Sequence, residues 1–284
     1  MKPEYLIEQR NEINAHHIYK RIAERVNDTH NKSVLIEISK DELKHYHRLR
    51  AQTKKDVKPN WLIIHFYTFI SLIFGITFGV KLMEKAEDAQ QIKYKDIYEA
   101  DPLLSEIIED EERHENELID MIDEEKLNYM GSIVLGLNDA LVELTGALAG
   151  YTFAFQNPKI IALTGLITGI SASFSMAASE FLSTRHSEEG EHALKSAIYT
   201  GIAYVITVFL LILPYLILDN PFMSLGAMLC VAVLIIFSFN YYISVAKDLP
   251  FKKRFFEMAG ISLTVSAISF LIGVVVKVVF GFDI

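Results

Sequence analysis

Residues 41–45 read Asp-Glu-Leu-Lys-His, and residues 110–114 read Asp-Glu-Glu-Arg-His. Each copy of this motif places a carboxylate and an imidazole three residues apart, and therefore on one face of a helix. Two Glu-x-x-His helices, with a Glu from each of two further helices, form the ligand set of a di-iron carboxylate four-helix bundle. The repeated motif thus predicts a metal-binding helical bundle in the first half of the chain.

Composition divides the 284-residue chain near residue 128, and we expect an all-α protein of two domains. Charged residues are frequent over 1–127, which predicts a soluble four-helix bundle. Apolar residues dominate 128–284, which predicts a membrane domain of five helices. The net charge of −9 argues against nucleic acid as a partner and favours cations. The single cysteine, Cys230, leaves no cysteine-based zinc site.

Apolar side chains at helical spacing predict the four soluble helices. They cover residues 4–27, 30–53, 82–99 and a stretch that begins at Asp101-Pro102. Glu12 and Glu87, on the first and third helices, are each followed by a tyrosine seven residues later. The two helix pairs share these landmarks, which indicates an internal duplication with four ligand-bearing helices around one centre.

Residues 61–80 carry no formal charge and are long enough for a sixth span. A span there would separate Glu12 and Glu42 from Glu87 and Glu111 by the membrane, and the four helices could not share a metal site. We therefore interpret this stretch as a crossover followed by the apolar start of the third helix. Its apolar surface would then lie on the membrane or be buried in a dimer contact.

Five apolar segments follow, each close to the ~20 residues that a helix needs to span a bilayer. They cover residues 130–155, 160–182, 196–218, 223–245 and 258–280. Basic residues gather in loops 183–195 and 246–257, which the positive-inside rule places in the cytoplasm with the N-terminal domain. The N-terminus lacks the apolar core of a signal peptide. We expect a multi-pass protein of the inner (cytoplasmic) membrane, with its C-terminus outside the cytoplasm.

Through the two motifs and the Glu–Tyr pairs, residues 1 to about 125 resemble the rubrerythrin branch of the ferritin-like proteins. In that branch the third helix often supplies two glutamates three residues apart, as Glu84 and Glu87 are here. The resemblance implies a di-iron centre, and manganese is a second metal that suits such ligands. The implied ligands are Glu12, Glu42, His45, Glu84, Glu87, Glu111 and His114. The chain lacks the rubredoxin module of rubrerythrins, which argues against an electron-transfer peroxidase.

Carboxylates inside the first two spans are costly in lipid, and each predicts a functional site. Asp139 and Glu143 lie one turn apart in the first span, and Glu180 lies one turn after Met176 in the second. Glu143 would be a second metal ligand or a proton acceptor. The alternatives are that Asp139 is a helix-end charge, that Glu180 reaches the cytoplasmic interface, and that Met176 is a core side chain.

These spans resemble the vacuolar iron transporter family, in Gly-Leu-Asn-Asp-Ala-Leu-Val at 136–142 and Ser-Met-Ala-Ala-Ser-Glu-Phe-Leu-Ser at 175–183. The resemblance covers residues 130–284. It implies five spans, a homodimer with its pore between the first spans, and proton-coupled export of ferrous iron. By this resemblance, the family's pore residues correspond to Asp139, Met176 and Glu180. Members of the family have a metal-binding insertion after the second span, where this chain has only a short loop. That loop holds residues that either relay metal or are simply solvated: Glu188, Glu189, Glu191 and His192.

These features together predict a homodimeric exporter of ferrous iron, with manganese as a second substrate. Its cytoplasmic di-iron bundle would collect the metal, and whether it also oxidises the metal is left open. Protons would move in the opposite direction through the same carboxylates, because a metal and a proton compete for one carboxylate. The rival hypothesis is a membrane-tethered ferroxidase, peroxidase or iron sensor whose spans do not transport.

Overall fold

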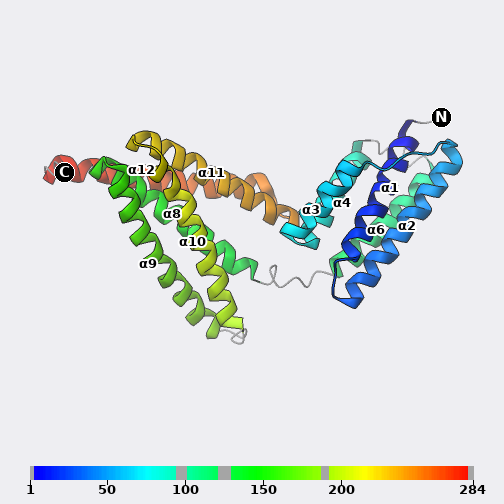
Figure 1. Cartoon of the computed structure of the whole chain (residues 1–284), viewed down its shortest axis with the longest axis horizontal. Helices are drawn as coiled ribbons and strands as arrows, with labels where there is room; N and C mark the ends of the chain where they lie inside the picture. Colours follow the sequence, from blue (N-terminus) through cyan, green and yellow to red (C-terminus); the bar gives the residue numbers. More distant parts are fainter. Residues whose placement is uncertain (1–2, 94–100, 121–128, 187–191, 281–284) are drawn as a thin grey trace. The chain divides into compact units, whose positions relative to one another are not determined.

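The computed structural model describes residues 3–93, 101–120, 129–186 and 192–280, and these form ten helices and no strands (Figure 1). This result confirms the all-α class predicted from the sequence. The chain divides into two compact units, Met1–Glu124 (unit 1) and Glu125–Ile284 (unit 2).

Unit 1 is built around one apolar core to which each of its described helices contributes. The helices are α1 (Pro3–Ala23), α2 (Thr29–Thr53), α3 (Trp61–Phe74), α4 (Ile76–Lys93) and α6 (Pro102–Asp120). The cluster contains, from the five helices in order, Ile18, Leu35, Ile64, Met83 and Leu118. Because one cluster joins them, the helices that carry the two motifs and Glu12 are held together by apolar packing.

The predicted soluble helices are present, with shifted ends. α1 ends at Ala23, before the predicted end at residue 27, and Asp28 caps α2 by accepting a hydrogen bond from the backbone N–H of Asn31. α4 begins at Ile76, earlier than the predicted start at residue 82, and residues 94–99 of that prediction lie outside the described residues.

The stretch 61–80, interpreted as a crossover followed by the apolar start of the third helix, consists of the separate helix α3 and the first turn of α4, which begins at Ile76. Gly75 has φ 101°, a backbone conformation that suits glycine, and it ends α3 just before α4 begins. At Gly79 an added Cβ would lie 1.9 Å from Oγ of Ser71, so α3 and α4 approach closely. With 14 residues, α3 is about 21 Å long and too short to cross a bilayer core of about 30 Å.

Unit 2 contains five helices that are long and apolar enough to cross a membrane, as the sequence predicted. They are α8 (Met130–Phe155), α9 (Pro158–Arg185), α10 (Ala193–Ile217), α11 (Pro221–Ala246) and α12 (Phe251–Phe280). α9 and α11 begin at Asn-Pro pairs, in which the Asn157 or Asn220 side chain accepts hydrogen bonds from the first backbone N–H groups. These caps fix where two of the spans begin.

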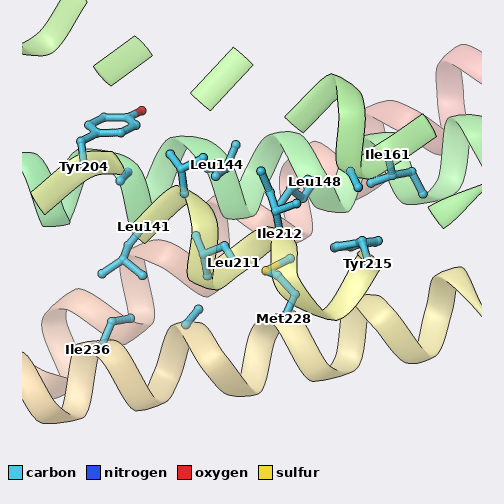
Figure 2. Packing of buried hydrophobic residues seen from close by; sticks show 14 of the residues in the cluster. Leu141, Leu144, Leu148, Ile161, Tyr204, Leu211, Ile212, Tyr215, Met228 and Ile236 are labelled. Atoms are coloured by element: carbon cyan, nitrogen blue, oxygen red, sulfur yellow. The ribbon is translucent and has the colours of Figure 1, made fainter. Parts of the chain in front are cut away.

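The interior of unit 2 is apolar, and α8 packs against each of the other four helices. Figure 2 shows Leu141 and Leu148 of α8 beside Leu211 and Ile212 of α10, with Met228 of α11 below them. The outer surface is apolar as well, and the outward residues of α9 are more than half exposed: Leu163, Ile167 and Phe174. An apolar surface on this scale fits lipid rather than water.

Candidate metal centre and membrane pathway

The candidate metal-centre residues of unit 1 come from three helices and meet in its interior. Glu12 lies on α1, Glu42 and His45 on α2, and Glu111 on α6. One ligand atom from each of these four lies within 4.8 Å of those of the others. Nδ1 of His45 is 3.4 Å from Oε2 of Glu12, 3.9 Å from Oε2 of Glu42 and 3.8 Å from Oε1 of Glu111. Three carboxylates therefore surround one imidazole nitrogen.

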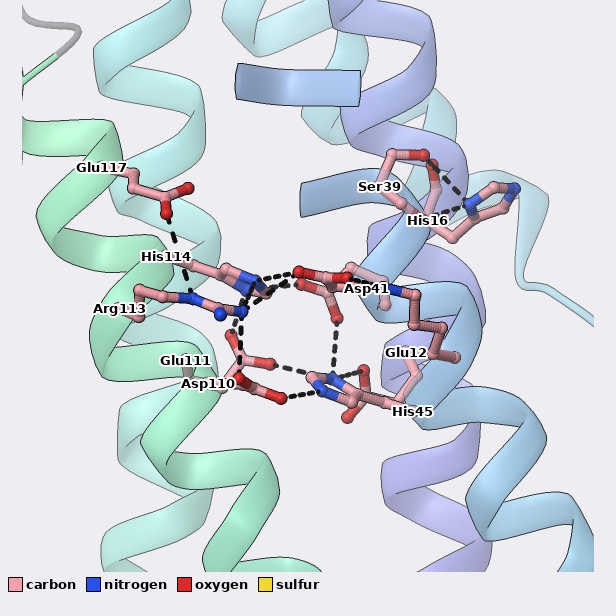
Figure 3. Close-up of polar contacts among 12 residues, drawn as sticks. Glu12, His16, Ser39, Asp41, His45, Asp110, Glu111, Arg113, His114 and Glu117 are labelled. Carbon is pink, nitrogen blue, oxygen red and sulfur yellow. Dashed lines mark hydrogen bonds and ion pairs between the residues drawn. The ribbon is translucent and has the colours of Figure 1, made fainter. Parts of the chain in front are cut away.

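His114 completes the second motif beside this group. Its Nδ1 lies 3.3 Å from Oε1 of Glu42 and 3.8 Å from Oε2 of Glu111. The His45 and His114 rings lie with their centres 6.2 Å apart, one from α2 and one from α6 (Figure 3). Glu42 and Glu111 thus lie near both histidines, which is the arrangement expected of carboxylates that bridge two metal ions.

The first residue of each motif supports the histidine of the other motif. Asp110 is hydrogen-bonded to Nε2 of His45 at 2.9 Å, and Asp41 lies 3.4 Å from Nε2 of His114. A metal-binding histidine usually donates its other N–H to such a carboxylate, which fixes its tautomer. Arg113 joins the two aspartates, since its Nη2 is 3.1 Å from Asp41 and 2.9 Å from Asp110. Both Nδ1 atoms are left facing the glutamates.

The electrostatics of the group show how crowded its negative charge is. Burial, and then the carboxylate of Glu12, raise the pKa of Glu42 to about 8. Burial would lower the pKa of His114, but the neighbouring carboxylates of Glu111 and Glu42 outweigh it and raise that pKa to about 10. Glu42 and His114 therefore each hold a proton more tightly than the free side chains do, and these protons compete with a bound cation. A bound cation must displace them, so metal binding is expected to strengthen as the pH rises.

The donor atoms fit a hard divalent metal ion. Within the described residues, Oε1 of Glu42 and Nδ1 of His45 and of His114 are buried and make no hydrogen bond. Buried polar atoms normally have a hydrogen-bond partner. Several buried atoms that converge without one therefore indicate a site for a bound ion. Carboxylate oxygens with imidazole nitrogens suit ferrous iron and manganese. A cation among these atoms would neutralise carboxylates that are otherwise costly to bury.

The remaining predicted ligands are on α4. Glu84 is half-buried, and its Oε1 is enclosed by protein, but it is not one of the four residues whose ligand atoms meet. The side chain of Glu87 lies outside the part of the chain that the structure describes. The contribution of the third bundle helix therefore stays a prediction.

In unit 2, Asp139 lines a cavity of about 660 Å³ between α8, α11 and α12. Asn138 is beside it, and its Oδ1 is buried without a hydrogen bond among the described residues. Glu257 and Met258 of α12 line the same cavity. The cavity therefore gathers carboxylate, amide and thioether groups that can ligate a transition metal, together with the cationic side chains of Lys253 and Arg254.

The other predicted pathway residues do not line this cavity. Glu143 accepts a hydrogen bond of 2.9 Å from the Tyr204 hydroxyl, and Glu180 accepts one of 2.7 Å from the Ser132 hydroxyl. Met176 packs against the apolar cluster of unit 2. Each glutamate thus has a neutral hydroxyl partner from another helix, which holds the carboxylate in place without cancelling its charge.

The predicted relay loop is largely outside the described residues, which exclude Glu188, Glu189 and Glu191. His192 is described, and its Nδ1 is 2.9 Å from the Tyr129 hydroxyl at the start of α8. This contact joins the beginnings of the first and third spans.

Two groups of residues had not been singled out from the sequence. Asp41 and Asp110 occupy the first position of the two motif copies. Their recurrence in the repeat could have indicated a role for both. Glu257 and Met258 belong to no motif, and only the packing of α12 against α8 reveals their place beside Asp139.

The comparison with known families gives a match for unit 2. Residues 130–194 match the model of the VIT family. The matched segment contains Asp139, Glu143, Met176 and Glu180. No curated protein matches the chain. With the five helices able to span a membrane, the match indicates a multi-pass membrane protein that transports metal ions. It does not reach unit 1, whose ferritin-like relationship remains a prediction.

Proposed function

We propose that the protein exports ferrous iron from the cytosol, and manganese as a second substrate, after collecting the metal on unit 1. The observation that carries the proposal is the joint presence of a VIT-family segment and a buried group of Glu12, Glu42, His45 and Glu111 in one chain. A carboxylate–imidazole centre selects the same class of cation that such a membrane domain moves.

In unit 1, Glu42, Glu111, His45 and His114 would hold the metal, with Glu12, Glu84 and Glu87 completing the ferritin-like set. Asp110 and Asp41 orient the imidazoles so that each Nδ1 faces the centre. Ferrous iron held by these residues would supply the electrons for a ferroxidase activity, with dioxygen as the oxidant. Displacement of the protons of Glu42 and His114 accompanies binding.

In unit 2, Asp139 would accept the transported ion, and Asn138, Glu257 and Met258 line its cavity. Glu180, Met176 and Glu143 would form the rest of the pathway, and the hydroxyls of Ser132 and Tyr204 hold the two glutamates in place. Because a carboxylate takes either a proton or a cation, proton counterflow through Asp139 and Glu143 would drive export.

The proposed setting is the inner membrane, with unit 1 and the basic loops in the cytoplasm. Cytoplasmic residues at the ends of the spans would include Arg185 of α9, Lys195 of α10 and Lys247 just after α11. The functional form would be a homodimer with its pore between the two α8 helices, as the family resemblance implies. The C-terminus would then lie outside the cytoplasm.

Flux through liposomes tests the proposal. The full-length protein is reconstituted, and ferrous iron or manganese entry is followed with a trapped fluorescent chelator under anaerobic conditions. We predict that Asp139→Asn reduces entry to the rate of protein-free liposomes, because the amide has no charge with which to bind the ion. Asp219→Asn, in the exposed loop between α10 and α11, is the matched control and should transport as the native chain does.

Transport that survives Asp139→Asn at the native rate would remove this residue from the pathway. The metal group in unit 1 also favours a second candidate, a membrane-tethered ferroxidase. That function predicts aerobic oxidation of ferrous iron by the same liposomes, with no metal entry in either variant.

A further inference from the structure

α3 presents an apolar face that none of the described residues of unit 1 covers. Its inward face is formed by Ile64, Thr68 and Ser71, which are buried. The opposite face, at the spacing i, i+4, i+7 and i+11, consists entirely of large apolar side chains. These are Leu62, Phe66, Phe69 and Ile73, with exposed fractions of 84%, 53%, 59% and 49%. A continuous apolar strip of this kind marks an interaction surface rather than a solvated one.

The strip has the surroundings of a membrane interface. Trp61 begins α3 and is half-exposed, and the guanidinium of Arg21 lies 5.1 Å from the centre of its ring. Lys54, Lys55 and Lys58 are exposed in the segment just before the helix. Tryptophan at the edge of an apolar helix suits the headgroup level of a bilayer, and nearby cations are attracted to anionic headgroups.

The five spanning helices of unit 2 attach unit 1 to a bilayer. Residues 121–129 alone separate the end of α6 from the first spanning helix. A connection of that length reaches at most about 30 Å even when fully extended. Unit 1 is therefore confined near lipid, which raises the effective concentration of membrane for any surface that can bind it.

We propose that the apolar face of α3 inserts into the headgroup–acyl boundary of the bilayer and docks unit 1 on the membrane surface. The helix lies in the plane of the membrane because it is too short to span. This placement keeps Glu12 and Glu42 on the same side of the membrane as Glu111. Arg21 and the three lysines face anionic headgroups. The inference is independent of what unit 2 transports.

Trp61 is the single tryptophan of the chain, so its fluorescence reports on α3 alone. The full-length protein is reconstituted in liposomes of phosphatidylcholine and phosphatidylglycerol, with bromine atoms at shallow, middle or deep acyl positions. Docking predicts a loss of Trp61 fluorescence that is greatest with the shallow bromines, since an interfacial helix sits about 5–10 Å into the boundary. The double variant Phe66→Glu/Phe69→Glu should abolish the loss, whereas Phe66→Leu/Phe69→Leu should retain it.

Two results would overturn the proposal. One is fluorescence that is the same in brominated and ordinary lipid. The other is quenching that persists in Phe66→Glu/Phe69→Glu, with manganese binding by unit 1 confirming that the variant is folded. The competing occupant is a second copy of α3. It would appear as no quenching together with disulfide-linked dimers of a Phe69→Cys variant made in a Cys230→Ser background.

Discussion

At the scale of single residues, Asp41 and Asp110 explain why an aspartate stands at the first position of each motif. Asp110 and Asp41 each contact the histidine of the opposite motif, so neither copy is complete without the other. This reciprocity gives a structural reason for the repeat, since each helix supplies ligands to the centre and an orienting group for its neighbour.

We predict that Asp110→Ala lowers the affinity of the full-length protein for manganese by about 10- to 100-fold, the usual effect of removing such a partner. His45 would lose the acceptor that fixes its ring. Glu109→Ala is the matched control, because Glu109 is the adjacent, exposed acid on α6. Calorimetric titration of both variants measures the change, and equal affinities in the two would show that Asp110 has no orienting role.

Several of the residues that converge in unit 1 could be predicted from the sequence at this scale. The spacing within each motif placed Glu42 with His45 and Glu111 with His114, and the structure brings both pairs together. The Glu–Tyr spacing predicts Glu12 as a ligand, and Glu12 also lies in the group. Glu257 could not be found this way, because a helix that approaches from far along the chain leaves no local pattern.

At the scale of elements, a glycine permits a close contact between the first and third spans. A Cβ added at Gly136 of α8 would lie 2.5 Å from the backbone oxygen of Thr200 on α10. The Thr200 hydroxyl donates a hydrogen bond of 3.0 Å to the backbone oxygen of Ser132 at the same contact. Small residues permit such approaches between membrane helices, where packing rather than the hydrophobic effect holds helices together.

Gly136→Ala should therefore destabilise the detergent-solubilised protein by about 1–3 kcal/mol, because backbone cannot move aside as a flexible side chain does. Gly131→Ala on the same helix has no atom within 4 Å of the added Cβ, so stability should be unchanged or slightly increased. Thermal unfolding followed by circular dichroism compares them. A Gly136→Ala protein as stable as Gly131→Ala would contradict the close α8–α10 contact.

The spans were predictable as elements because apolar runs of this length have few alternatives. α3 was not, because the uncharged stretch 61–80 fits a span, a crossover or a helix equally well by composition. The break at Gly75 and the burial of Ile64 in the core of unit 1 are tertiary features, and they decide between those alternatives.

At the scale of the whole molecule, one chain carries a buried carboxylate–imidazole group and five helices able to span a membrane. The acidic net charge of −9 suits a protein whose partners are cations. If α3 docks on lipid as proposed, metal collection takes place at the membrane surface rather than in the bulk cytosol. The central claim is that unit 1 binds metal.

Anomalous diffraction tests that claim most directly. Crystals of the full-length protein are soaked anaerobically in ferrous iron, and data are collected on both sides of the iron absorption edge. We predict iron peaks among the carboxylates of Glu12, Glu42 and Glu111 and the Nδ1 atoms of His45 and His114. Iron-soaked crystals with no peak at these residues, while the side chains stay converged, would contradict the account.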